Sequence, residues 1–184
     1  TRRGKTEYRI GGEACRRASE LAETFPLLLV APETLGFLSG TPAARRRFLN
    51  WGVFHVEPLF GNLWKAAQHC LQQRNALLKH AKIDPEQKTI WTEQYVAAAE
   101  QVRESVENYL DTLKPLFNAM LDQIMGFYDL ELEYVHGWQG SESLATAMME
   151  NEQQDQHRGF TGAGHHRSDL RLLCDGQDAV DVMS

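Results

Sequence analysis

Residues 91–125 read WTEQYVAAAEQVRESVENYLDTLKPLFNAMLDQIM and form the most periodic segment of the chain. Their apolar side chains advance by three or four positions, which is typical of one buried stripe on a long helix. The residues of this near-heptad seam are Tyr95, Ala99, Val102, Val106, Tyr109, Leu113, Leu116, Met120 and Ile124. Pro115 cannot donate a backbone bond to the carbonyl of Asp111, so we expect a kink or a fresh helix start there.

A second helix is expected before this segment, from about residue 58 to residue 81, because its apolar residues follow the same spacing. The turn at residues 83–85 then predicts a helical hairpin. A further helix is expected from Thr41 to about Phe54. Thr41 is a favourable N-cap, and Pro42 lies in the first turn, where its missing N–H has no cost.

Strands are expected toward both ends of the chain. Residues 128–134 alternate apolar and acidic side chains, which is the pattern of a half-buried strand. Helices are expected at 13–25 and at 141–156, the second capped by Ser141. Other strands are expected at residues 8–10, 26–31, 170–174 and 179–182. The predicted fold class is α+β, with a helical-hairpin arm inserted between the strands of a base.

The composition is that of an ordinary globular protein, and the chain of 184 residues has a formal net charge of −6. Residues 1–47 hold nine Lys and Arg against five Asp and Glu, whereas the remainder holds ten against twenty. A DNA-binding surface would therefore have to be a local patch. The three cysteines are far apart, and no segment is apolar enough for a membrane span, so we expect a cytoplasmic protein with reduced thiols. The first methionine is Met120, which suggests a partial sequence.

Three arginines, Arg45, Arg46 and Arg47, lie in the first turns of the helix expected after Thr41. The helix dipole disfavours positive charge at this end. Either acidic neighbours such as Glu33 and Glu57 or a bound anion should compensate for it. Two roles remain open: internal ion pairs that fix the loop to the base, or direct contact with phosphate.

A glycine-rich segment near the C-terminus, Thr161 to Leu170, contains two adjacent histidines. A metal site with His157, Asp169 and Cys174 is disfavoured, because adjacent side chains on an extended chain point in opposite directions. The histidine and arginine donors suit an anion or an internal acidic partner better. Structural support is the role we favour for Asp169.

Two strings of residues resemble the RecF family of bacterial recombination mediators. Residues 32–50, PETLGFLSGTPAARRRFLN, resemble its signature, except that Thr41 replaces a smaller residue and Asn50 an aspartate. Residues 164–170, GHHRSDL, match a second family string in which His165 replaces a proline. Residues 51–58 and 72–78 also look like RecF, so the resemblance extends over essentially the whole chain.

The resemblance implies part of an SMC/ABC-type ATPase lobe. Residues 1–40 would end its N-terminal part, residues 41–126 would form the helical arm, and residues 127–184 would return into it. It also implies ATP and Mg²⁺ in the full-length protein, but this sequence contains no Walker A or Walker B motif. Gly4-Lys5-Thr6 matches only the end of a phosphate loop. The fragment alone is therefore expected to be non-catalytic and to bind neither cofactor through its own motifs.

The resemblance assigns roles to two groups of residues. Arg45, Arg46 and Arg47 would serve DNA binding or contacts between lobes. His166, Arg167, Asp169 and Ser184 would support the nucleotide-binding face, with Ser184 at the first position of the family's Ser-Arg-Gly-Gln motif. No metal ligands are assigned.

The implied function is an ATP-dependent DNA-binding recombination mediator that acts in DNA repair, replication-fork maintenance and SOS induction. Its implied partners are single-stranded and linear double-stranded DNA and their junctions, other recombination mediator proteins, and a second copy in an ATP-dependent homodimer. No membrane partner is implied. The alternative is a stand-alone helical interaction module without nucleotide chemistry.

Overall fold

The structure is a computed structural model that describes residues 7–15, 17–25, 27, 40–80, 84–125 and 129–182. The chain divides into two compact units, Thr1–Leu35 and Gly36–Ser184, and each is described by itself. The domain boundaries expected after residues 40 and 126 stay a prediction.

The first unit contains a short β-hairpin followed by a helix. Strands β1 (Tyr8–Ile10) and β2 (Glu13–Cys15) are antiparallel, and α1 spans Ala18–Thr24. The strand and the glycine turn were predicted, but the expectation of a helix from residue 13 was wrong. Gly11 and Gly12 both have positive φ, which reverses the chain so that the next residues pair with β1. The strand expected at 26–31 lies, apart from Leu27, outside the described residues.

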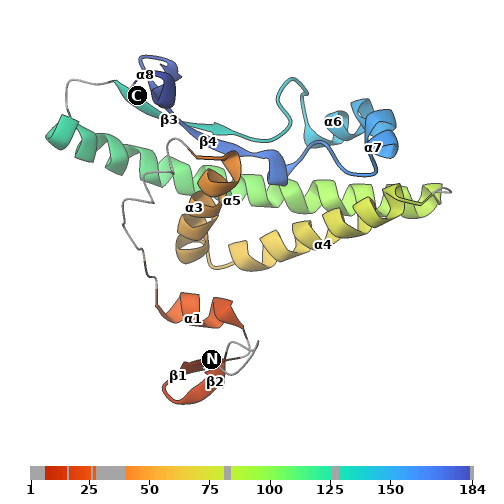
Figure 1. Ribbon diagram of the computed structural model, residues 1–184, viewed down its shortest axis with the longest axis horizontal. Coiled ribbons are helices and arrows are strands. Elements are labelled where there is room, and N and C mark those ends of the chain that lie inside the picture. The colour runs from red at the N-terminus through yellow and green to blue at the C-terminus, as the bar shows by residue number, and fades with distance from the viewer. Residues whose placement is uncertain are drawn as a thin grey trace. The chain divides into compact units, whose positions relative to one another are not determined.

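Three helices begin the second unit: α3 (Pro42–Val56), α4 (Phe60–Leu78) and α5 (Pro85–Met125). Helix α4 runs alongside the N-terminal half of α5, so the predicted helical hairpin is present (Figure 1). Thr41 is the N-cap of α3 and Pro42 its first residue, although the Thr41 side chain makes no capping hydrogen bond. None of the helices that the structure describes combines the length and apolar character needed to cross a bilayer.

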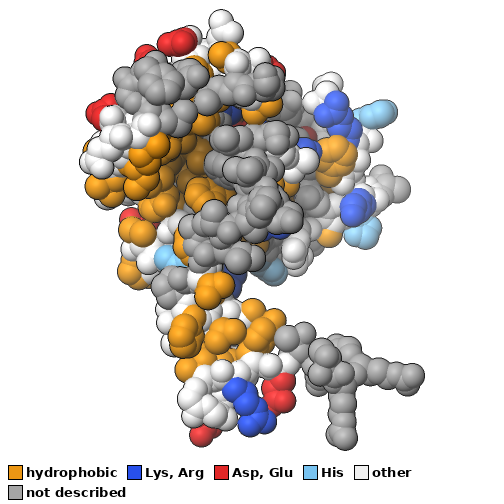
Figure 2. All heavy atoms as spheres, turned by 60° about the vertical axis from the view of Figure 1, so that its left-hand side comes forward, with side chains coloured by type: hydrophobic (Ala, Val, Ile, Leu, Met, Phe, Trp, Pro, Cys, Tyr) orange, Lys and Arg blue, Asp and Glu red, His pale blue; other side chains and the backbone are white. Residues whose placement is uncertain are grey.

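Helix α5 continues through Pro115, so the alternative of a fresh start there was wrong. Its buried stripe departs from the heptad seam after Leu113. The seam members Tyr109 and Leu113 still pack against the core beside the buried Leu110, but the packed positions that follow are Phe117 and Leu121. A straight helix has 3.6 residues per turn, so a seam with a 3.5-residue period drifts around it. Its last three members are consequently exposed: Leu116 by 65%, Met120 by 62% and Ile124 by 69%. Figure 2 shows hydrophobic side chains gathered where this end of the unit faces the viewer.

The C-terminal part of the second unit forms an antiparallel sheet in the order β3 (Leu130–Val135), β4 (Asp169–Cys174) and β5 (Gln177–Asp178). The first two strands agree with the predicted ones, and Asp175 and Gly176 turn the chain with positive φ. The strand expected at 179–182 was wrong, since α8 (Ala179–Val182) is a short helix. Asp178 Oδ1 accepts a hydrogen bond from the Val180 N–H, which satisfies a donor at the helix start.

Between β3 and β4 the chain forms two short helices, α6 (Leu144–Glu150) and α7 (Glu152–Arg158), instead of the single helix expected. Ser143 is the N-cap of α6, because its side chain accepts from the Thr146 N–H, whereas Ser141 donates to Glu150. A short 3₁₀ turn, η2 (His165–Arg167), precedes β4. One core cluster includes Leu49 of α3, Val106 of α5, Leu132 of β3 and Leu170 of β4. The helices and the sheet of the second unit therefore share a hydrophobic core.

Candidate functional site

The site lies where the N-terminal end of α3 meets the loop before β4. Nε of Arg45 donates to Oδ1 of Asp169 at 2.9 Å, and Nη2 donates to Oδ2 at 2.7 Å. Nη1 of Arg45 also donates to the Gly40 carbonyl at 2.8 Å. The hydrogen bond to Asp169 raises the pKa of Arg45, so the guanidinium stays charged. The carboxylate compensates for positive charge at the start of α3.

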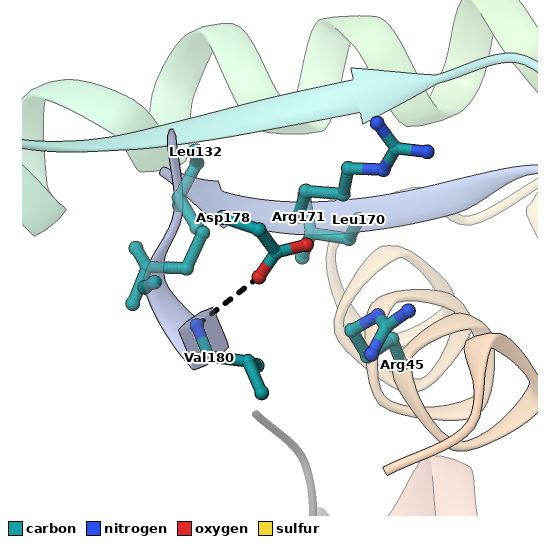
Figure 3. Close-up of a pocket in the computed structure, with 8 residues that line it drawn as sticks. Arg45, Leu132, Leu170, Arg171, Asp178 and Val180 are labelled. Carbon is teal, nitrogen blue, oxygen red and sulfur yellow. Dashed lines mark hydrogen bonds between the residues drawn. The ribbon is translucent and has the colours of Figure 1, made fainter. Parts of the chain in front are cut away.

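A second acidic residue faces the same arginine from β5. Figure 3 shows Asp178 turned toward Val180, with Arg45 across a small cavity. The charge of Asp178 adds to the rise in the pKa of Arg45. The cavity measures about 10 Å³, which is at the lower limit for one water molecule, so it is too small for a nucleotide or substrate.

Arg46 and Arg47 differ in exposure. Nη1 of Arg46 donates to the Ser168 carbonyl at 2.7 Å, which ties α3 to the residue before Asp169. Burial, with repulsion from Arg167 and Arg45, lowers the pKa of Arg46. Arg47 is exposed to solvent. Of the three arginines, Arg47 is therefore the one whose side chain stands in solvent.

A chain of hydrogen bonds around Tyr95, a buried residue of α5, holds the loop before β4 in place. Nε2 of His166 lies 3.1 Å from the Thr161 carbonyl and must donate to it, so Nδ1 of His166 accepts from the Tyr95 hydroxyl at 3.0 Å. Tyr95 has one proton, so Nδ1 of His165, at 3.3 Å, must donate to its oxygen. Nε2 of His165 then accepts from the Gln68 amide at 2.9 Å.

This network requires both imidazoles to be neutral. Burial lowers the pKa of His165 to about 4, and the charges of His166 and Arg46 act in the same direction. Burial also lowers the pKa of His166 to about 4, against the hydrogen bond to the Thr161 carbonyl. The pair therefore serves as fixed hydrogen-bond donors and acceptors near neutral pH. No group of three or more metal-ligating side chains occurs among the described residues.

The network leaves no room for a larger residue at Gly164. This glycine has a φ of +133°, and a Cβ added there would lie 1.9 Å from the Tyr95 hydroxyl oxygen. Arg167, three residues later on the other side of the histidines, is exposed and lies over the Phe160 ring at 5.9 Å from its centroid. The tight packing beneath the loop therefore fixes where Arg167 emerges.

The structure thus brings Arg45, Arg46, His166, Arg167 and Asp169 to one junction, whereas Ser184 lies outside the described residues. Sequence reasoning missed a second polar centre beneath the same loop. Arg74 of α4 is 2% exposed, and its Nη1 donates to Asp155 at 2.9 Å and to Thr161 at 2.5 Å. The detectable signal was an arginine on the buried face of α4, between Leu71 and Leu78.

Comparison with known proteins gives one consistent result. The DNA replication and repair protein RecF of Pseudomonas aeruginosa strain LESB58 is 38% identical over 183 residues, which cover 100% of this chain and 50% of the relative. RecF of Pseudomonas putida strain GB-1 is 39% identical with the same coverage. The chain therefore spans about half the length of these relatives. No protein-family model matches it.

Solved structures agree on the fold. A structure of the recombination mediator protein RecF-ATP in the RecFOR pathway superimposes with a TM-score of 0.85 at 21% identity, over 96% of this chain and 50% of the other. The RecF-ATPrS structure of the same pathway gives 0.83. The predicted fold class is confirmed, as is the resemblance to RecF.

Proposed function

We propose that this chain, which is similar to RecF sequences and spans about half of their length, supplies a DNA-contacting surface of a recombination mediator. The observation that carries the proposal is the junction of α3 with the loop before β4. There the exposed Arg167 lies near Arg46, and Arg47 extends into solvent from the same turn of α3. The arginine side chain suits phosphate oxygens, because its planar guanidinium presents several donors.

The arginines at this junction would have two different roles, positioning and phosphate contact. The side chain of Arg45 is 14% exposed and that of Asp169 is 9% exposed, so Arg45 is a positioning residue that holds α3 against β4. Arg46 reinforces the position through the Ser168 carbonyl. Arg47 and Arg167 are the exposed members, and they would contact phosphate directly.

The complete protein would act in DNA repair, replication and SOS induction in the cytoplasm, on single-stranded and linear double-stranded DNA and their junctions. It would use ATP and Mg²⁺, form an ATP-dependent homodimer and work with other recombination mediator proteins. The RecF relatives named above and the structure of RecF-ATP in the RecFOR pathway support this assignment. His166, Arg167, Asp169 and Ser184 would support the nucleotide-binding face, with the catalytic motifs supplied by sequence outside this chain.

The DNA role is tested by the salt dependence of binding. Anisotropy titrations of labelled duplex and single-stranded oligonucleotides at several KCl concentrations would compare the chain with Arg47→Ala, Arg167→Ala and Arg158→Ala. Each lost phosphate contact should reduce the slope of log K against log salt by about 0.9 on duplex and about 0.7 on single strands. Arg158 is an exposed arginine at the end of α7 and provides the control, with an unchanged slope.

Equal slopes for the Arg47 and Arg167 variants and the parent would reject the DNA surface. The helical interaction module without nucleotide chemistry would then gain support, and the complete gene would distinguish the two. A phosphate loop upstream of Thr1 and a continuation after Ser184 as Arg-Gly-Gln would favour the RecF function. Their absence would favour the interaction module.

A further inference from the structure

A groove separate from the arginine junction runs between the N-terminal half of α5 and the helices α6 and α7. Its volume is about 590 Å³. The α5 residues that line it lie on one face of three helical turns: Pro85, Lys88, Thr89, Thr92, Glu93, Val96 and Ala97. This face is about 18 Å long at roughly 1.5 Å per residue. The opposite wall comprises Ala145, Met148 and Met149. Figure 1 shows α6 and α7 beside this half of α5.

The groove contains a buried guanidinium with unused donors. Nε of Arg74 donates to Thr92 at 3.1 Å, and both hydrogens of Nη1 are used by Asp155 and Thr161. Nη2, with two further N–H donors, has no partner among the described residues. The described side-chain atoms sealed from solvent without a partner are His55 Nε2 and His136 Nδ1. Nη2 therefore keeps some access to solvent, and Arg74 is among the residues that line the groove.

The charges around the groove determine which acceptor suits Nη2. Asp155 neutralises Arg74, and Glu152 neutralises Lys88 at the edge. Glu93 is exposed on the same face of α5, so the groove has a net negative charge. A neutral carbonyl or amide oxygen therefore fits Nη2 better than a phosphate, and a cationic group fits the edge near Glu93.

We propose that this groove binds an amphipathic helix of a partner protein. The apolar side of that helix would pack on Val96, Ala97 and Met148. One of its side-chain amide oxygens would accept from Nη2 of Arg74, and a lysine or arginine would pair with Glu93. A groove three turns long with one buried polar anchor matches the helix-in-groove mode of recognition.

The probe is a pair of synthetic 15-residue helical peptides. Each carries leucines at positions i, i+3, i+4 and i+7 and one glutamine in the apolar stripe. One peptide has flanking lysines, and the other has glutamates at the same places. Binding to the full chain is followed by NMR of ¹³C-labelled methionine methyl groups. Met148 and Met149 report on the groove, and Met120 reports on the exposed apolar residues near the C-terminal end of α5.

The lysine peptide should shift the Met148 and Met149 signals saturably and leave Met120 unchanged. Glu93→Lys should weaken the lysine peptide about three-fold and strengthen the glutamate peptide similarly, which is the range of an exposed ion pair. Ala97→Trp, which fills the groove from an exposed position, should abolish saturable binding. Glu104→Lys, an exposed charge reversal elsewhere on α5, should change neither peptide.

Equal affinity of the two peptides, a response at Met120 instead of Met148 and Met149, or no shift at millimolar peptide would each overturn the proposal. Unchanged peptide binding by the Ala97→Trp variant with parental melting temperature would also overturn it. The DNA proposal is tested separately, because Arg47 and Arg167, the residues changed in that test, do not line this groove.

Discussion

The guanidinium of Arg45 and the carboxylate of Asp169, 124 residues apart in the sequence, form a two-point ion pair that joins the start of α3 to the start of β4. Because both side chains are largely buried, the pair is shielded from solvent and has little freedom to reorient. It fixes the turn of α3 from which Arg46 and Arg47 extend.

A double-mutant cycle on Arg45→Ala and Asp169→Ala should give a coupling free energy of about 1–3 kcal/mol, measured by urea unfolding. The matched control is Arg171 and Glu133, whose closest atoms are 3.9 Å apart and whose side chains are nearly half exposed. That cycle should give less than about 0.5 kcal/mol. Similar coupling in the two cycles would contradict the positioning role of Arg45.

The buried ion pair of Arg74 and Asp155 should be costly to break from one side. Arg74→Met would leave the carboxylate of Asp155 without its charge partner, so the free energy of unfolding should fall by about 3–5 kcal/mol. The double variant Arg74→Met/Asp155→Leu should recover part of this loss, because the Gly162 N–H also loses its acceptor when Asp155 is replaced. A double variant less stable than Arg74→Met alone would show that the unpaired carboxylate of Asp155 is not the cause of the loss. Removal of the partly exposed pair Arg103 and Glu107 should have a smaller effect.

Stability should fall as the pH is lowered from about 6.5 toward 4. His165 and His166 have folded-state pKa values of about 4, below the ordinary value of 6.5, so the unfolded chain binds more protons in this range. Each imidazole could contribute on the order of 3 kcal/mol as an upper limit. Below pH 4 this contribution is fully lost, and above 6.5 it is fully present.

The measurement is the free energy of unfolding between pH 4.5 and 7. His165→Gln should reduce the slope, whereas His157→Gln, at an exposed position on α7, should keep it. A parental slope in the His165 variant would show that acid sensitivity arises elsewhere.

Two leucines of α5 test which of its residues form the buried stripe. Leu110 is 2% exposed, so Leu110→Ala should cost about 2–5 kcal/mol. Leu116 belongs to the heptad seam but is exposed by 65%, so Leu116→Ala should change stability by less than about 0.5 kcal/mol. Thermal and urea unfolding of the two variants would measure the difference. A larger loss of stability for Leu116→Ala than for Leu110→Ala would show instead that the buried stripe follows the heptad seam.

The sequence by itself determined the features that depend on neighbours a few residues apart. The long helix, the alternating strand at 130–135, the turn at Asp175-Gly176 and the α+β class follow from periodicity and turn chemistry. The two strings that resemble RecF also stand in the sequence itself, and the relatives confirm that resemblance.

Tertiary structure decided the rest. The sequence shows which residues of α5 are apolar, but packing partners select which of them are buried. A 3.5-residue repeat drifts around a 3.6-residue helix by about 20° per heptad, so the two separate over the length of α5. Likewise, the sequence left open whether Arg45 meets an anion or an internal acid. Asp169 became its partner because the shared core of α3, α5 and the sheet brings residues 124 positions apart within hydrogen-bond distance, and local pattern carries no information about such contacts.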